Sequence, residues 1–258
     1  MRLDGHERPA AGFMRQSWVA DLRAARVLVF GILVVTGSLA PSRGRPVTEA
    51  PVTWLIFVDD LHINFRDMGL VKNLLTSIAT HLIRDGDSFA VRSSGPSDLS
   101  ITLSSNRALL DPAIPKVSYG GFELTDGVGS ETNDEVRYRA KFAGTAAVEM
   151  LNALPRETIG RAAMLYISNG DFLIPADVTV AGLPRTAQRF AITVFALSPR
   201  GLRRGHQVTR SGAPALSERY RDDAMLNSLR AIAGPTGGFA IEEADFADAL
   251  QRIGRAMR

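Results

Sequence analysis

An unbroken run of apolar residues that ends in two adjacent carboxylates is the feature that most constrains the fold. Residues 54–60 read W-L-I-F-V-D-D, and L-H-I-N-F follows. An apolar run of this length is typical of a strand that is buried on both faces. The carboxylates of Asp59 and Asp60 are costly to bury unless other groups pair with them. The end of this strand is therefore the first place to look for a functional site.

Segments with strand and helix patterns alternate from residue 51 onward. Apolar residues recur at helical spacing in 69–83, and strand patterns follow at 87–93 and 99–104. The linker G-P-S-D between these two strands is too short for a crossover helix, so the strands should form an antiparallel hairpin. The other expected elements are helices at 107–117, 144–154, 222–233 and 244–257, and strands at 54–58, 162–167, 190–197 and 239–241.

This alternation predicts an α/β fold with a doubly wound, mostly parallel sheet of about six strands, one antiparallel edge strand and helices on both faces. In such sheets ligands bind at the carboxyl ends of the strands, where the winding reverses. Asp59 and Asp60 end one strand, and Asn169 follows the strand at 162–167. If these strands are neighbours, the side chains face one crevice, with the hydroxyl of Thr145 arriving from the loop before a helix.

The order of the segments resembles a von Willebrand factor type A domain over residues 51–258. The matching pieces are, in chain order, W-L-I-F-V-D-D, L-I-R-D-G-D-S-F-A-V, G-T-A-A-V-E-M-L, M-L-Y-I-S-N-G-D, I-T-V-F-A-L and L-R-A-I-A-G-P-T-G-G-F. The form with D-D-L-H after the first strand is similar to the von Willebrand-related proteins of acidobacteria. The resemblance implies a Rossmann-like fold and an adhesion or assembly function through protein binding.

The resemblance also implies a metal-ion-dependent adhesion site, although the family's pattern is degenerate in this chain. In the family, a partner's carboxylate completes the oxygen shell of magnesium (Mg2+) or manganese (Mn2+). Thr145 matches the family's threonine, and Asn169 stands where a second aspartate is expected. The family's D-x-S-x-S motif is absent, whichever aspartate begins it.

The register of this motif stays open. Counting from Asp59 places Leu61 and Ile63, which cannot coordinate, at the serine positions, whereas counting from Asp60 places His62 and Asn64 there. The implied ligand set is Asp59, Asp60, His62, Asn64, Thr145 and Asn169. The alternative is a metal-free crevice, in which one of the two carboxylates accepts hydrogen bonds from loop amides near Gly144 and Gly170 and holds the crevice closed.

Three functional classes follow from these observations. The first is a protein-interaction module, with or without a cation, whose unknown partner offers a carboxylate if the cation site works. The second is a metal-free structural domain of an envelope assembly. The third, a hydrolase, is disfavoured because the chain has no G-x-S-x-G, H-E-x-x-H or phosphate-loop motif and no cysteine. The basic residues are scattered, which does not indicate nucleic-acid binding.

Two long connections are a second candidate for a binding surface. They span residues 118–142 and 198–221, and both exceed the usual length of a loop in a compact domain. The first is rich in acidic residues and the second in arginine. They could form a protein-binding face or pair with each other.

The N-terminal segment has the pattern of an export signal. Residues 1–26 are polar and carry several arginines, residues 27–40 are apolar and uncharged, and residues 41–50 form a linker. We expect a basic cytoplasmic region, then a signal peptide or membrane anchor, then an exported domain at 51–258 in the periplasm or cell envelope, secreted or anchored. The apolar run is short for a membrane span, whereas Pro41 disfavours cleavage after Ala40, so both forms stay open.

Export is tested by fusing residues 1–50 to a reporter that is active only outside the cytoplasm. We expect an active reporter, because the arginines keep the N-terminal side in the cytoplasm and the rest is translocated. An inactive reporter would remove the export prediction.

Overall fold

The computed structural model describes residues 50–119, 133–155, 160–170, 182–201, 216–241 and 245–258. The chain divides into two units, Met1–Val47 and Thr48–Arg258, and all described residues belong to the second. The expected basic region at 1–26, the apolar segment at 27–40 and nearly all of the linker at 41–50 therefore lie outside the described residues. Among the described residues, no helix is both long and apolar enough to cross a membrane.

A six-stranded sheet with the order β3-β2-β1-β4-β5-β6 forms the centre of the domain. Its strands are β1 Val52–Val58, β2 Ser88–Ser93, β3 Ser100–Ser104, β4 Arg161–Ile167, β5 Thr193–Leu197 and β6 Ala240–Ile241. All neighbouring strands are parallel except β2 and β3, which pair antiparallel at one edge. The chain winds outward from β1 to β3 and then returns to the other side of β1 for β4. The predicted doubly wound sheet with an antiparallel edge strand is confirmed.

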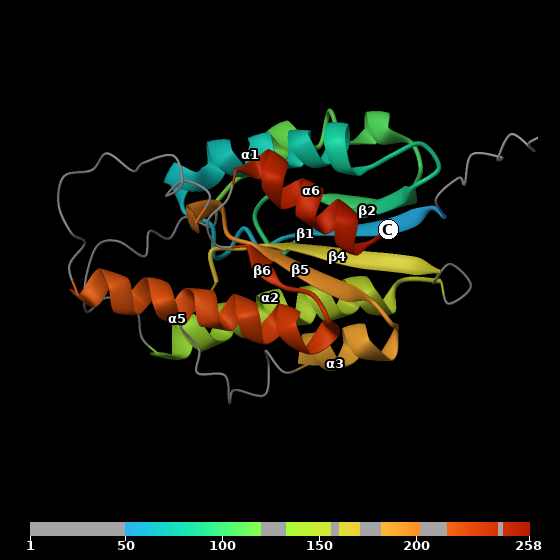
Figure 1. Cartoon of the computed structure of the whole chain (residues 1–258). Coiled ribbons are helices and arrows are strands. Elements are labelled where there is room, and N and C mark those ends of the chain that lie inside the picture. The colour runs from blue at the N-terminus through green and yellow to red at the C-terminus, as the bar shows by residue number, and fades with distance from the viewer. Residues whose placement is uncertain (1–49, 120–132, 156–159, 171–181, 202–215, 242–244) are drawn as a thin grey trace, which may run out of the picture. The chain divides into compact units, whose positions relative to one another are not determined.

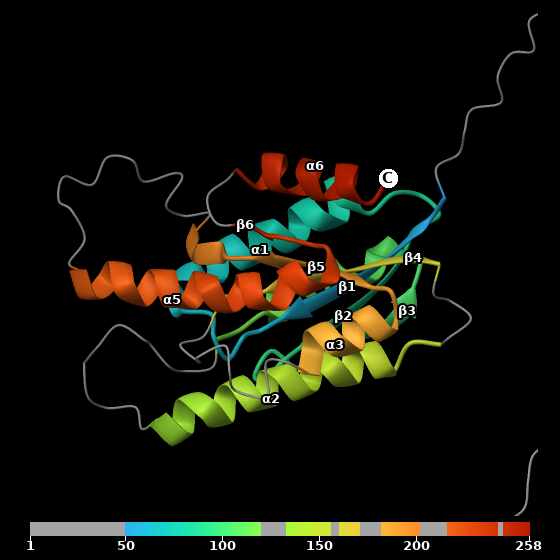
Figure 2. The same ribbon diagram turned by 60° about the horizontal axis from the view of Figure 1, so that its bottom comes forward.

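Helices cover both faces of this sheet (Figures 1 and 2). One face carries α1 (Met68–Ser77) and α6 (Phe246–Ala256), and the other carries α2 (Asn133–Asn152), α3 (Gly182–Arg189) and α5 (Leu216–Ala233). Successive side chains of a strand point to opposite faces. Trp54 and Ile56 accordingly pack in the core beside α1 and α6, whereas Leu55 and Phe57 pack in the core beside α2, α3 and α5. Both faces of β1 are buried, which explains why its run is apolar at every position.

The helix expected at 107–117 is the clearest error of the sequence prediction. The structure has two short 3-10 turns there, Arg107–Leu109 and Ile114–Lys116. Pro112 and Pro115 each lack a backbone N–H group, and their rings obstruct the preceding turn of an α-helix. Two prolines this close together explain why the apolar pattern does not become a helix.

Two helices begin earlier than expected, and a third was not expected at all. α2 begins at Asn133 rather than at residue 144, so the end of the first long connection is helical. α5 begins at Leu216 rather than at residue 222. The remaining parts of the two long connections, 120–132 and 202–215, lie outside the described residues. The helix α3, between β4 and β5, was missed, because its eight residues are too few for a clear apolar repeat.

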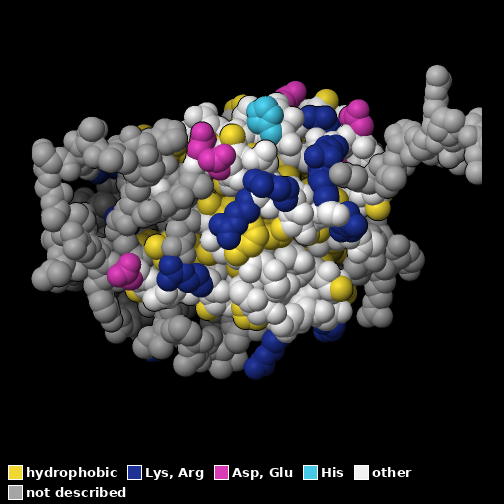
Figure 3. Space-filling view, in the orientation of Figure 1, with side chains coloured by type: hydrophobic (Ala, Val, Ile, Leu, Met, Phe, Trp, Pro, Cys, Tyr) yellow, Lys and Arg dark blue, Asp and Glu magenta, His cyan; other side chains and the backbone are white. Residues whose placement is uncertain are grey.

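Charged side chains of both signs lie on the face of the molecule seen in Figure 3, and apolar side chains show between them. Near the last strand, the guanidinium of Arg252 lies 4.1 Å from the centroid of the Phe239 ring. An arginine over an aromatic ring covers apolar surface and gains a cation–π attraction. Part of the arginine content of the chain therefore contributes to packing.

Candidate functional site

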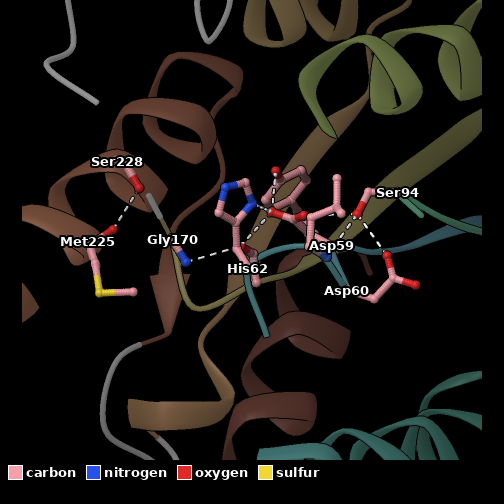
Figure 4. Close-up of polar contacts among 10 residues, drawn as sticks. Asp59, Asp60, His62, Ser94, Gly170, Met225 and Ser228 are labelled. Atoms are coloured by element: carbon pink, nitrogen blue, oxygen red, sulfur yellow. Dashed lines mark hydrogen bonds and ion pairs between the residues drawn. The ribbon is translucent and has the colours of Figure 1, made fainter. Parts of the chain in front are cut away.

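Asp59 lies at the carboxyl end of β1, in the middle of the sheet, and is only 1% exposed. Its carboxylate accepts hydrogen bonds from the hydroxyls of Ser94 (3.0 Å), Ser168 (2.8 Å) and Tyr166 (3.2 Å). Nδ1 of His62 lies 2.8 Å from the same carboxylate, so that Asp59 stands between His62 and Ser94 (Figure 4). Four groups from the ends of β1, β2 and β4 thus converge on one carboxylate.

Asp60 is also buried, and it is bonded to the turn between β2 and β3. Its Oδ1 accepts from the hydroxyl of Ser94 (2.8 Å), and its Oδ2 accepts from the backbone amide of Ser97 (2.7 Å). The hydroxyl of Ser97 donates to the carbonyl of Ser118 (3.0 Å) and accepts from the amide of Ser118 (2.9 Å). Asp60 therefore connects the loop after β1 to the β2–β3 turn and, through it, to the segment at Ser118.

The hydroxyl of Ser94 is shared between the two carboxylates. It accepts a hydrogen bond from the amide of Leu61 (3.2 Å) and lies within hydrogen-bond distance of both Asp59 and Asp60. A hydroxyl has one proton to donate and two lone pairs to accept with. The Ser94 hydroxyl can therefore donate to only one of the two carboxylates at a time.

The surroundings of the two aspartates shift their pKa values in opposite directions. Burial opposes ionisation of Asp59, but the His62 ring and the hydrogen bonds to its carboxylate outweigh burial and hold the pKa of Asp59 below its ordinary value. Burial raises the pKa of Asp60, and the charge of Asp59 raises it further, against the hydrogen bonds from Ser97 and Ser94.

Asn169 lies at the end of β4, and its partners are not the paired aspartates. Its Nδ2 donates to Oδ2 of Asp67 (3.1 Å), a buried carboxylate at the start of α1, and its Oδ1 accepts from the amide of Arg200 (3.1 Å). Both polar atoms of the Asn169 amide are thus used in joining β4 to α1 and to the segment after β5. Sequence reasoning placed Asn169 at the correct edge of the sheet but missed Asp67.

Two other members of the predicted ligand set, Thr145 and Asn64, contribute no side-chain hydrogen bond to the paired aspartates in the described residues. Thr145 is exposed in the middle of α2, because this helix begins twelve residues before it, and the expectation of Thr145 in a loop before the helix is wrong. No hydrogen bond among the described residues joins Thr145 to either aspartate. Asn64 is buried, and its Oδ1 has no hydrogen-bond partner in the described part of the chain.

The carboxylates of Asp59 and Asp60 do not by themselves offer the coordination that a magnesium or manganese ion needs. A hard cation needs several acceptor oxygens directed at one point, whereas the carboxylate oxygens of Asp59 and Asp60 face hydroxyl and amide donors. No group of three or more His, Asp or Glu side chains in the described segments is arranged to hold a metal. The metal-free alternative expected donors from loop amides near Gly144 and Gly170. Among the described residues the donors are instead Ser94 and Ser97, and the amide of Gly170 reaches Asp59 only through the hydroxyl of Ser168.

We call Asp59, Asp60, Ser94, Ser97 and Ser168 the carboxylate latch. Gly170 lies between this latch and α5. On the side of the latch, the amide of Gly170 donates to the hydroxyl of Ser168 (3.0 Å), and that hydroxyl donates to Asp59. The φ angle of Gly170 is +83°, and a Cβ atom there would lie 2.3 Å from the carbonyl oxygen of Met225 in α5 (Figure 4). Only glycine permits this backbone conformation and this close approach.

The hydroxyls bonded to Asp59 do not show the order of groups found in a nucleophilic triad. In such a triad the nucleophilic hydroxyl bonds to the histidine, and the histidine bonds to the carboxylate. Here the hydroxyls of Ser168 and Tyr166 donate to the carboxylate itself, and both residues are buried. The arrangement stabilises a negative charge and activates neither hydroxyl as a nucleophile.

Comparison of the chain with models of known protein families gives no match, and comparison with curated proteins gives none. Among solved structures, the chain is similar to the crystal structure of the TFIIH p34 N-terminal domain, with 15% sequence identity and a TM-score of 0.44. The similarity covers 80% of this chain and 97% of that chain. It adds no argument about the latch, so the functional reasoning rests on the geometry.

The two carboxylates should affect stability in acid with opposite sign. Ionised Asp59 stabilises the fold above its ordinary pKa, and this stabilisation is lost as the pH falls through the lowered pKa of the folded state. Folded Asp60 takes up a proton at higher pH than the unfolded chain does, which adds stability as the pH falls through its raised pKa. We expect Asp60→Asn to steepen the loss of stability between about pH 6 and about pH 2, and Asp59→Asn to flatten it.

Urea unfolding at a series of pH values measures both effects. At pH 7 we expect Asp59→Asn to cost about 2–4 kcal/mol, because it leaves buried donors without an ionised acceptor. Asp85→Asn is the matched control, since the Asp85 side chain is fully exposed. Parallel pH curves for wild type, Asp59→Asn and Asp60→Asn would contradict the opposite roles.

Proposed function

We propose that this chain is an exported protein-interaction module of the von Willebrand factor A type, in which the buried carboxylate latch holds the loops that carry the binding surface. One observation supports this proposal above the others. Phe65 is 59% exposed and Tyr119 is 36% exposed, and their rings meet edge to face with centroids 5.3 Å apart. Large aromatic side chains left at the surface in contact with each other are typical of protein-binding sites.

The latch connects to both aromatic residues through the chain. Phe65 begins a short 3-10 turn, Phe65–Asp67, at the end of the loop that leaves Asp60. Tyr119 follows Ser118, whose backbone bonds to Ser97, and the amide of Ser97 bonds to Asp60. The carboxyl edge of the sheet therefore supports an aromatic pair built from two loops that are more than fifty residues apart in sequence.

Arg66 extends this surface and gives it a preference for a partner. It is exposed and makes no ion pair in the described part of the chain. Arginine and tyrosine are among the residues that contribute most to binding energy at interfaces, and a guanidinium can bind a carboxylate through two hydrogen bonds. The surface formed by Phe65, Arg66 and Tyr119, here called the aromatic rim, suits a protein partner with an apolar side chain and a carboxylate.

Export in this proposal is supported by the N-terminal sequence pattern alone. The donors that surround Asp59 and Asp60 favour a metal-free form of the module, and they also support a second candidate, a structural domain of an envelope assembly with an inert crevice. The described hydroxyls near Asp59 donate to its carboxylate and are not activated as nucleophiles, so they give no support to an esterase or a protease. We propose that the chain is not an enzyme. The two remaining candidates differ in whether the aromatic rim has a partner.

Partner capture by variants of the rim separates these two candidates. The tagged full chain is crosslinked in its native cells, and the captured proteins are quantified by mass spectrometry. We expect Phe65→Ala and Arg66→Ala each to lower the recovery of a specific partner by about tenfold or more, as for residues at the centre of an interface. Both residues are exposed, so the melting temperature should change little.

Leu109→Ala is the matched control, because Leu109 is also a large exposed apolar residue but lies on a 3-10 turn outside the rim. It should capture the same partner as the wild-type chain. If the rim variants recover the same proteins in the same amounts as wild type, the rim is not the binding surface and the structural-domain candidate is favoured.

Thermal melting with and without divalent cations tests the metal-assisted form of the module. Binding of an ion to the folded state alone raises the midpoint as the ion concentration rises. For a metal-free latch we expect the full chain to melt at the same temperature in EDTA and in millimolar magnesium or manganese. A rise that disappears in Asp59→Ala or Asp60→Ala would instead establish a cation site and identify its aspartate.

A further inference from the structure

A cavity of about 490 Å³ lies between α2 and the end of β2, away from the rings of the aromatic rim. Its walls come from β2 and the turn that follows, from the start of β3, and from the exposed side of α2. The residues that matter for its chemistry are Arg92, Asp98, Phe142, Thr145 and Glu149. The volume falls within the range of about 300–1,000 Å³ that is usual for sites that bind small groups.

The charged residues of this cavity leave one negative charge uncompensated. Arg92 and Glu149 form an ion pair at 2.6 Å, in which β2 is joined to α2, so their charges cancel. Asp98 is exposed and has no ion pair in the described part of the chain. Its φ angle of +46° belongs to the turn G-P-S-D, in which the amide of Asp98 donates to the carbonyl of Gly95 (3.1 Å). The turn presents this carboxylate at the cavity wall.

An exposed aromatic surface borders the same cavity. The ring of Phe142 lines the cavity and is 48% exposed. Tyr138, one helical turn earlier, is 65% exposed, and its ring centroid lies 6.2 Å from that of Phe142. The face of an aromatic ring attracts a cation, and the ring also packs against the aliphatic stem of a lysine or arginine. A carboxylate and an aromatic ring on one cavity favour a cationic side chain over an anionic or a neutral one.

We infer that the cavity between α2 and the β2–β3 turn binds a lysine or arginine side chain of a partner protein. Asp98 provides the counter-charge, Phe142 provides the apolar and cation–π contact, and the exposed hydroxyl of Thr145 adds a hydrogen-bond acceptor. The Arg92–Glu149 pair closes one wall without adding net charge. This basic-residue site is distinct from the aromatic rim and does not rest on the function proposed for the rim.

The test uses the full chain and short blocked peptides that differ in one side chain. The probes are acetyl-Gly-Arg-Gly-amide and, for comparison, acetyl-Gly-Gln-Gly-amide, and binding is followed by NMR chemical-shift changes. We expect saturable shifts at Phe142 and Thr145 with the arginine probe and binding at least about fivefold weaker with the glutamine probe, as for the loss of one charge contact.

Asp98→Asn removes the charge while keeping the backbone, because asparagine tolerates a positive φ. It should weaken binding of the arginine probe by about fivefold or more, and Phe142→Leu should weaken it as well. Asp111→Asn is the control, since Asp111 is an exposed aspartate that does not line the cavity.

Two results would overturn the inference. One is equal binding of the arginine and glutamine probes, and the other is unchanged binding in both Asp98→Asn and Phe142→Leu. Phe65→Ala should bind the arginine probe as wild type does. The partner-capture experiment and the peptide-binding experiment can therefore contradict the two proposals independently of each other.

Discussion

The rest of the structure depends on how the carboxylate of Asp59 is buried. An ionised carboxylate loses its hydration at the centre of a sheet edge, and this loss is tolerated only where donors replace the water. The donors come from the ends of β2 and β4, the two neighbours of β1, and from the loop after β1 itself. The strand order makes the latch possible, because it places the ends of β2 and β4 on either side of Asp59.

The second aspartate extends this constraint from the core to the surface. When both aspartates are ionised, the single hydroxyl proton of Ser94 cannot serve both carboxylates. Asp60 also accepts from the amide of Ser97, and this bond fixes the turn after β2. That turn reaches Tyr119 of the aromatic rim through Ser118, and it carries Asp98 at the cavity beside α2. Two exposed surfaces with different chemistry are thus supported by one buried network.

Much of the fold could be predicted from the sequence, but the site could be predicted only in part. The apolar run of β1 and the short G-P-S-D linker are local patterns, and they predicted the central strand and the antiparallel edge correctly. The partners of Asp59 are not local, since Ser94 and Ser168 are separated from it by 35 and 109 residues. Serines in polar loops after buried strands give no signal of their own, and only the strand order shows that they meet. Asp67 was missed for the same reason, because its partner Asn169 is 102 residues away.

The same packing explains why the resemblance to a metal-binding family is incomplete in this chain. At the two positions where that family has serine ligands after Asp59, the chain has Leu61 and Ile63. Ile63 is buried in the core beside α1, and the side chain of Leu61 lies against the turn at Gly95, where a Cβ would be only 3.1 Å from Leu61 Cδ2. These two side chains hold the loop after β1 by apolar contacts, and His62 between them holds it by its bond to Asp59. Packing and hydrogen bonds therefore both fix the conformation of the loop after β1.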